Sequence, residues 1–304
     1  ETGTKRMKEE AEAAGWNVRI IDPLKLSIVV DDDGGRLLHK GWPIDCDAVI
    51  PRIGHSITRR GVSVVRAFER MGVIVLNKGD GIQSSRDKLL ASQKMNEGGV
   101  PIPTTAQVGT WQDTRRAVSR VGGTPCVIKT NEGTHGSGVF LAHTEQQARQ
   151  LVYQMLERGL RPLVQEYIRE SHGQDIRAFV VGGKVVASMR RKAKGSEFRS
   201  NFHLGGEVEK LSITGEYAEI ACKAAEILGL EIAGVDMLES ERGPLVLEVN
   251  SSPGLEGIEA ASGVNVANRI ISNLASLYKS RQEAEEKQLI PRSQGGDEEA
   301  KGKA

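Results

Sequence analysis

Residues 232–254 read IAGVDMLESERGPLVLEVNSSPG, and they set the architecture of the C-terminal half of this 304-residue chain. The apolar runs Ile232–Leu238 and Leu245–Val249 flank a polar segment that contains a glycine. Two short apolar runs joined by such a segment predict a β-hairpin. We therefore expect antiparallel sheet here.

Three polar side chains interrupt this hairpin. Glu248 and Asn250 lie two residues apart and so share one face of their strand, and Asp236 on the partner strand can converge on that face. Because the strands are otherwise apolar, these carboxylates would be half buried and need a counter-charge. An all-oxygen set of this kind is typical of magnesium. The alternative is that each acid faces water at a strand end.

The region before this hairpin also consists of short strands and helices. The predicted strands are residues 125–129, 138–141, 163–166, 175–181 and 184–187, and the predicted helices are residues 144–157 and 214–228. The pair Gly182-Gly183 is a hairpin turn signal. We expect antiparallel sheet with helices on one side, an α+β arrangement.

A glycine-rich segment joins two of these strands. Residues 132–138 read EGTHGSG, and the glycines let backbone N–H groups approach phosphate oxygens. Lys129 ends an apolar run beside this segment and is well placed to meet a phosphate, and Lys88 is a second candidate. The segment matches neither common glycine-rich nucleotide motif, so a flexible hairpin loop is the alternative. For Lys88 the alternative is an exposed helix lysine.

Residues 190–201 form a basic stretch, RRKAKGSEFRSN, with five cations and one anion. Such a stretch binds phosphate, an acidic peptide or RNA, or it is simply a solvated charged surface. Aromatic residues make up only 4% of the chain, which argues against RNA. We therefore expect no direct nucleic-acid binding.

Strands and helices alternate before residue 101. The predicted elements are a helix over residues 4–14, strands at 18–21, 47–51 and 73–76, and helices over 58–71 and 87–96. This alternation predicts α/β structure with a parallel sheet. Pro101-Ile-Pro103 marks a domain edge. At the other end, residues 281–304 are nearly all polar and predict a disordered tail.

The composition limits the classes of function. Forty-one basic and forty acidic side chains give a net charge of +1, which argues against a global nucleic-acid field or charge-driven membrane attachment. Cys46, Cys126 and Cys222 show no paired spacing and read as free thiols of a reducing compartment. The chain has no long apolar run, so the expectations are a cytoplasmic location and no membrane contact.

Eight motifs in order resemble the ATP-grasp superfamily and, within it, the RimK-type alpha-L-glutamate ligases. They are RDKL at 86–89, PCVIK at 125–129, EGTHGSG at 132–138, QEY at 165–167, DIR at 175–177, RSN at 199–201, GVD at 234–236 and EVNSSPG at 248–254. PRIG at 51–54 and SPGLEGI at 252–258 match the RimK type in particular. The resemblance covers about residues 22–277.

The resemblance implies an ATP-grasp fold in which the last two domains grip ATP. The implied units are a parallel-sheet pre-ATP-grasp domain at 1–100, a small central domain at 101–170, an antiparallel-sheet C-terminal domain at 171–280 and the tail at 281–304. The family's N-terminal domain opens with a short strand that has no counterpart before Glu1. We therefore expect the sheet of this domain to lack one strand.

The resemblance also implies roles for individual residues. The residues expected to contact ATP are Lys88, Lys129, Gly133, Gly136 and Gly138 at the phosphates, Glu166 and Tyr167 at the adenine, Asp175 at the ribose, and Arg199, Ser200 and Asn201 at the phosphate end. Asp236, Glu248 and Asn250 would hold two magnesium ions, with manganese as an alternative. Arg177 and Arg190 are the predicted catalytic residues, which would hold an acyl phosphate.

The implied reaction is ATP-dependent formation of an amide through an acyl phosphate. The family adds L-glutamate to the acidic C-terminus of the sixth small-subunit ribosomal protein, and the basic stretch suits such an acceptor. A homo-oligomer is also expected. Three other functions stay open: a related ligase with another acceptor, such as a carrier-protein tail or a small peptide, a nucleotide-binding regulator without ligase chemistry, and a kinase on the same fold.

Overall fold

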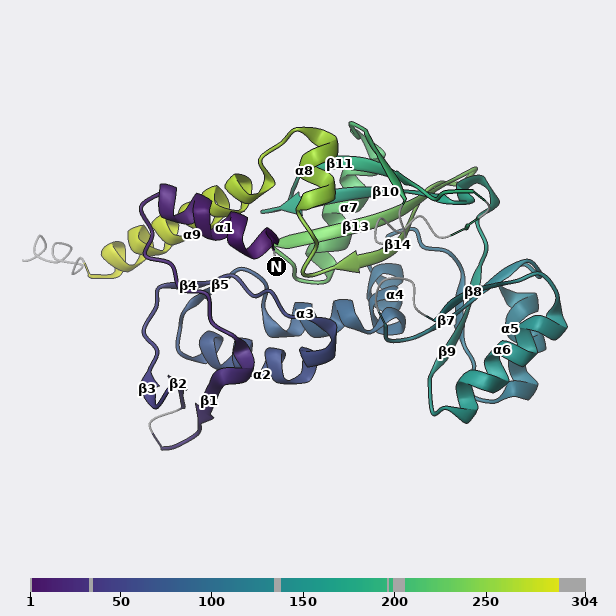
Figure 1. Ribbon diagram of the computed structural model, residues 1–304, viewed down its shortest axis with the longest axis horizontal. Coiled ribbons are helices and arrows are strands. Elements are labelled where there is room, and N and C mark those ends of the chain that lie inside the picture. Colours follow the sequence, from purple (N-terminus) through teal and green to yellow (C-terminus); the bar gives the residue numbers. More distant parts are fainter. Residues whose placement is uncertain (1, 33–34, 134–137, 196, 199–205, 290–304) are drawn as a thin grey trace, which may run out of the picture.

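The computed structural model describes residues 2–32, 35–133, 138–195, 197–198 and 206–289. Three units follow one another along the chain (Figure 1). An N-terminal unit lies beside the long C-terminal helix, a small central unit projects at the opposite end, and a five-stranded sheet lies between them. This arrangement agrees with the predicted combination of α/β and α+β structure.

The N-terminal unit contains a small parallel sheet. Strands β4 (Ala48–Val49) and β5 (Ile74–Val75) are parallel, and helix α2 (Thr58–Arg70) connects them. Val64, Ala67 and Phe68 of this helix are buried in the hydrophobic core that the helix forms with these strands. The predicted parallel pair with a helical crossover is therefore confirmed.

Two features of this unit differ from the prediction. The predicted strand at residues 18–21 is wrong, because these residues pair with no strand in the described chain. The sequence analysis also missed a three-stranded antiparallel sheet of β1 (Leu26–Val29), β2 (Arg36–His39) and β3 (Trp42–Pro43). These strands are too short, at two to four residues, to show a clear alternation of apolar and polar residues.

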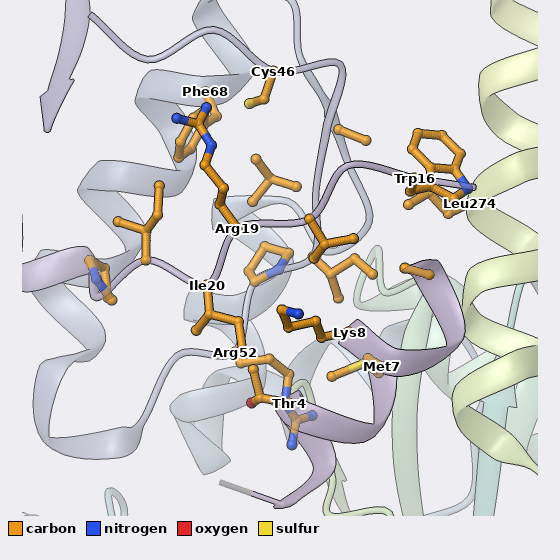
Figure 2. Close-up of a pocket in the computed structure, with 18 of the residues that line it drawn as sticks. Thr4, Met7, Lys8, Trp16, Arg19, Ile20, Cys46, Arg52, Phe68 and Leu274 are labelled. Carbon is orange, nitrogen blue, oxygen red and sulfur yellow. The ribbon is translucent and has the colours of Figure 1, made fainter. Parts of the chain in front are cut away.

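A cavity of about 780 Å³ borders the unpaired segment. Figure 2 shows its lining, in which Met7 of helix α1 (Thr2–Ala13) and Leu274 of helix α9 (Val266–Leu289) lie opposite Ile20 and Phe68. Residues 18–21 line this space, and no strand of the described chain pairs with them. The expectation that this domain lacks one strand stays a prediction.

The central unit is a four-stranded antiparallel sheet covered on one side. The strand order is β6 (Thr105–Gln107), β9 (Pro162–Glu166), β7 (Cys126–Thr130) and β8 (Val139–Ala142). Helices α5 (Thr114–Arg120) and α6 (Glu145–Glu157) pack on it through a core that includes Ile128, Ala148 and Val152. Here the prediction of helices on one side of the sheet is confirmed.

The C-terminal sheet has five antiparallel strands. Their order is β12 (Glu207–Lys210), β11 (Lys184–Lys192), β10 (Gln174–Val181), β13 (Ile232–Ser240) and β14 (Gly243–Asn250). Both predicted hairpins, β10–β11 and β13–β14, are present. Helix α7 (Glu216–Ile227) covers one face, whereas α8 (Glu256–Ser262) and α9 cover part of the other. For this sheet the prediction of helices on one side is therefore wrong.

Two helices join the N-terminal unit to the central one. Helix α3 (Gly79–Arg86), which was not predicted, is followed directly by α4 (Lys88–Glu97). Asp87 caps α4 by accepting a hydrogen bond of 2.9 Å from the Leu90 N–H. Because the two helices follow each other directly at this cap, Arg86 and Lys88 are held close together.

Gly81 provides a test of this packing. A Cβ atom on Gly81 would lie 2.7 Å from the carbonyl oxygen of Gly229 and 2.8 Å from that of Leu228. Because backbone must move to make room, we expect Gly81→Ala to lower the free energy of unfolding by about 1–3 kcal/mol in urea titrations. Gly109→Ala, where a Cβ meets nothing within 4 Å, is the control. Equal stability of the two variants would contradict this packing.

The C-terminal helix runs further than expected. The tail predicted to be disordered from residue 281 is helical up to residue 289, and residues 290–304 lie outside the described residues. Arg281 and Glu285 are spaced by one helical turn, and their side chains form an ion pair of 2.7 Å that stabilises the last part of this helix. No helix in the described part of the chain has the length and apolar content needed to span a membrane.

Candidate active site

A cavity of about 340 Å³ lies where the three units meet. Its lining comes from the C-terminal sheet, from strands β7 and β9 of the central unit, and from two segments of the N-terminal unit that end at His55 and Lys88. We call it the central cavity. Most of the predicted site residues line it, and these are Lys88, Lys129, Gly133, Glu166, Tyr167, Asp175, Arg177, Asp236, Glu248 and Asn250.

Two arginines and two aspartates form a buried network on the sheet. Arg177 donates to both carboxylate oxygens of Asp236 at 2.6 and 2.7 Å, and Arg191 donates to Asp175 at 2.6 and 2.5 Å. Arg191 also reaches across β10 to Asp236, at 2.9 Å. All four side chains are at most 16% exposed.

The network keeps its members charged. Burial acts to raise the pKa of Asp236, but Arg177 and Arg191 outweigh it and hold this pKa below its usual value. Burial likewise opposes the charge of Arg191, but Asp236 and Asp175 outweigh it and raise the pKa of Arg191. The counter-charge expected for Asp236 is thus supplied by two arginines. Asp175, predicted to meet the ribose, is held by Arg191.

Glu248 and Asn250 lie beside this network. Glu248 is directly opposite Asp236 in the β13–β14 register, and the Asn250 side-chain amide lies 3.5 Å from an Asp236 oxygen. The sequence therefore predicted this convergence correctly. Glu248 is half-buried, and its carboxylate forms no ion pair or hydrogen bond with a side chain in the described part of the chain.

The oxygen donors at this place fit magnesium. Glu248 and Asn250 both face the central cavity with side-chain oxygens, the ligand type that this ion prefers. In the described part of the chain, no three His, Cys, Asp or Glu side chains form a complete metal cluster. Magnesium commonly takes only one or two protein carboxylates and completes its shell with phosphate oxygens and water. The site therefore suits a magnesium ion that arrives with a nucleotide.

Two lysines line the cavity, Lys129 on strand β7 of the central unit and Lys88 at the start of α4. Lys129 is 5% exposed and donates a hydrogen bond of 2.9 Å to Gln165. Burial, reinforced by the charge of Lys88 and opposed by that of Glu248, lowers the pKa of Lys129 to about 8. Lys88 donates to the Gly133 carbonyl at 3.0 Å. Both positions suit contacts to phosphate.

Other predicted nucleotide contacts lie at the end of β9. Glu166 accepts hydrogen bonds from the Thr104 N–H at 3.0 Å and from Arg242 at 2.7 Å. The Tyr167 hydroxyl is hydrogen-bonded to the ring of His172. Gly138, the last residue of the glycine-rich segment, is described, whereas Gly136, Arg199, Ser200 and Asn201 lie outside the described residues.

Arg190 is not part of the cavity lining, contrary to the predicted catalytic role. It is opposite Ile176 in the β10–β11 register, on the face that α7 covers, and it donates to Glu239 at 2.9 Å. Its neighbour Arg191 points to the cavity because adjacent side chains of a strand face opposite sides. The geometry therefore favours Arg177 and Arg191 over Arg190.

We expect Arg190→Met to change kcat by less than about twofold, because it removes only a half-exposed ion pair with Glu239 worth at most about 1 kcal/mol. Arg191→Met should instead abolish the ATP-dependent activity that the resemblance implies, since it leaves Asp175 and Asp236 short of a buried partner. Steady-state ADP release by the two variants checks this difference. Equal losses of kcat in the two variants would support the catalytic role predicted for Arg190 from the sequence.

The sequence analysis missed several residues that line the cavity. Arg191 was placed in the basic stretch without a separate role, and Arg52, His55 and Arg86 were only quoted or passed over within motifs. For Arg191 a signal existed, because the strand period assigns the two adjacent arginines to opposite faces. For His55 and Arg86 the separation in sequence from the C-terminal sheet hides their proximity.

The chain matches two family models. The RimK-like ATP-grasp domain matches residues 85–274, and the RimK PreATP-grasp domain matches residues 2–82. A probable alpha-L-glutamate ligase of Aeromonas salmonicida is 47% identical over 272 residues, which are 89% of this chain and 91% of that protein. The protein of the same description from Legionella pneumophila strain Corby is 47% identical over 277 residues, covering 90% and 92%.

Solved structures share the fold at low sequence identity. The ATP-grasp ligase PsnB complexed with minimal precursor superposes with a TM-score of 0.72 at 20% identity, over 91% of this chain and 95% of that one. A RimK domain protein ATP-grasp from Sphaerobacter thermophilus gives 0.69 at 20% identity, over 90% and 95%. These likenesses concern the arrangement of the three units.

Proposed function

Because the chain belongs to the RimK family of ATP-grasp ligases, we propose that it uses ATP and magnesium to join L-glutamate to a protein carboxylate. The acceptor that we propose is the C-terminus of the sixth small-subunit ribosomal protein. The observation that carries the proposal is the central cavity, where Lys88 and Lys129 face Glu248, Asn250 and the arginine network.

In this proposal Lys88 and Lys129 hold the phosphates of ATP. Both lysines line the cavity, and their bonds to Gly133 and Gln165 already hold the two ammonium groups in place there. Glu248 and Asn250 would hold magnesium, which neutralises the charge that develops as the γ-phosphate is transferred. Asp236 was predicted as a third ligand, but it is bound by Arg177 and Arg191, so in this proposal it orients these arginines beside the magnesium site. Glu166 and Tyr167 line the same cavity and would contact the adenine.

Arg177 is the proposed catalytic residue of the second step. The acceptor carboxylate would attack the γ-phosphate, which forms an acyl phosphate and ADP, and the amine of glutamate would then displace phosphate. Arg177 is 16% exposed and held by both oxygens of Asp236, so its charge is fixed before substrate enters. A fixed cation of this kind stabilises an anionic adduct without reorganisation.

A polypeptide acceptor agrees with the structural neighbours. PsnB has been solved with a precursor peptide and AMPPNP, and the macrocyclase MdnC with the precursor peptide MdnA. The basic stretch at residues 190–201, which includes Lys192 and Lys194, has cations that suit an acidic chain end. A related ligase with a different peptide acceptor is therefore the second candidate.

Intact-mass spectrometry tests the function and its acceptor together. The purified ribosomal protein is incubated with the enzyme, ATP, magnesium and L-glutamate. Steps of about 129 Da indicate added glutamate, and a step of about 80 Da would indicate a kinase, both from the chemical formulae of the groups. ADP release without any mass step would reject this acceptor and retain the second candidate. No ADP release with any acceptor would leave a nucleotide-binding regulator.

We also propose that the protein assembles as a homo-oligomer. Val30 and Trp42, on and beside the three-stranded sheet of the N-terminal unit, are 82% and 77% exposed. Large apolar side chains exposed to this extent favour contact with another protein surface. Light scattering after size-exclusion chromatography measures the assembly, and a monomer would reject it.

A further inference from the structure

One wall of the central cavity comes from the N-terminal unit and carries positive charge. Arg52, His55 and Arg86 line this wall together with Ser252, which follows β14. Arg52 donates to the Pro253 carbonyl at 2.8 Å, and Arg86 donates to a backbone carbonyl at 2.7 Å. These bonds fix both guanidinium groups before any ligand binds, which favours tight recognition.

Arg86 has charge available for a ligand. It forms no ion pair with any residue in the described ranges, and its Nε atom is buried there without a hydrogen-bond partner. Burial lowers the pKa of Arg86 and Glu248 raises it, and an arginine remains protonated in such a setting. A half-buried guanidinium without a carboxylate partner favours the binding of an anion.

His55 adds a hydrogen-bond acceptor to the same wall. Burial, together with the charges of Arg86 and Lys88, lowers the pKa of His55 despite the opposing charges of Glu132 and Glu248. Its ring is therefore neutral at neutral pH, and a neutral imidazole offers one acceptor nitrogen. The Nδ1 atom of His55 and the Ser252 hydroxyl are buried, and neither has a partner among the described residues.

We infer that this wall binds the free amino-acid substrate, with Arg86 and Arg52 holding a carboxylate of L-glutamate and with His55 and Ser252 accepting hydrogen bonds from its amino group. The inference rests on the proposed function. A free amino acid carries a carboxylate and an amino group on one carbon, which matches a cation beside an acceptor. The last residue of a polypeptide acceptor has no free amino group, so it matches only the cation. Lys129 of strand β7, and Lys88 through its bond to the Gly133 carbonyl, remain for phosphate.

Arg86→Met tests this assignment. The KM for L-glutamate should rise at least tenfold, because charge-assisted hydrogen bonds to carboxylates contribute about 1.5–3 kcal/mol and about 1.4 kcal/mol corresponds to a factor of ten. The KM values for ATP and for the acceptor should change less than about twofold. Arg66→Met is the matched control, because Arg66 is ion-paired to Asp80 on the surface and does not line the cavity.

Two further measurements separate the outcomes. Arg86→Lys keeps the charge and should lose less glutamate affinity than Arg86→Met, and His55→Gln should raise the KM for glutamate about three- to tenfold. A rise in the KM for the acceptor or for ATP, with that for glutamate unchanged, overturns the inference.

If the wild type adds no glutamate to any acceptor, the proposed function fails. Calorimetric titration of the enzyme and MgADP with L-glutamate then tests the site by itself. Binding that Arg86→Met abolishes would uphold the site, and no binding to the wild type would overturn it.

Discussion

Asp236→Asn is expected to reduce kcat for ADP release by roughly 10³-fold or more, a loss comparable to that of a single key charge-stabilising group in an enzyme site. Asp236 orients Arg177 through two hydrogen bonds of 2.6 and 2.7 Å and also pairs with Arg191. The neutral amide cannot accept from both arginines in this way. Arg177 would therefore lose its fixed orientation, and a carboxylate would be missing next to Glu248.

The same substitution should also lower stability. Removing one partner of a buried ion pair costs about 3–5 kcal/mol, because a buried charge is left uncompensated. Arg191 is 6% exposed and, among the described residues, would keep Asp175 as its one carboxylate partner. We expect urea titration to show a loss at the lower end of this range, since asparagine can still accept one hydrogen bond.

Glu239→Gln is the matched control for Asp236→Asn. Glu239 lies on the same strand, β13, and also pairs with an arginine, but it faces α7 and does not line the central cavity. It should keep kcat within about twofold of the wild type. Activity of Asp236→Asn within tenfold of this control would show that the buried network is structural only.

The hairpin at residues 232–254 and the parallel pair β4–β5 could be predicted because local patterns determine them. In both places apolar runs of strand length are bounded by glycine or by a helix with a clear end. The convergence of Asp236, Glu248 and Asn250 followed from the strand period alone. These are the parts of the fold and site that depend on neighbours in sequence.

The remaining site residues depend on contacts that local sequence does not show. Arg191 reaches Asp236 across an intervening strand, so the partner of Asp236 could not be identified before the strand order β11-β10-β13 was known. The segment at residues 18–21 has the composition of a strand but no neighbour with which to pair. Strand propensity is a property of a single segment, whereas a sheet forms only where at least two strands pair.

Helix α9 continues past residue 281, where the sequence predicted disorder. A polar composition predicted disorder, but the residues there are good helix formers with charges spaced by four. The helix also starts inside the core, where Ile270 is fully buried. A helix nucleated by packing can extend into a polar segment that would not be helical alone.

Lys129→Met is expected to weaken nucleotide binding while it stabilises the fold. Lys129 is 5% exposed, and among the described residues its ammonium group hydrogen-bonds to the neutral side chain of Gln165. Removing a charged contact to phosphate should raise the Kd for MgADP roughly 10- to 100-fold. Calorimetric titration measures it, and Lys94→Met is the control, because Lys94 bonds the Ser84 hydroxyl away from the cavity.

The stability gain of Lys129→Met should depend on pH in a defined direction. The pKa of Lys129 is about 8 in the folded protein and 10.5 for an ordinary lysine, so between these pH values the unfolded chain binds more protons than the folded one. The wild type therefore gains stability from this group as the pH rises from about 8 to 10.5, whereas the methionine variant does not. One pKa unit corresponds to about 1.4 kcal/mol, which gives an upper limit of about 3 kcal/mol for the advantage of the variant at pH 7. Urea titrations at pH 7 and pH 10 should show that the stability advantage of the variant over the wild type shrinks as the pH rises. A stability advantage that stays constant or grows would mean that Lys129 is not buried with its charge.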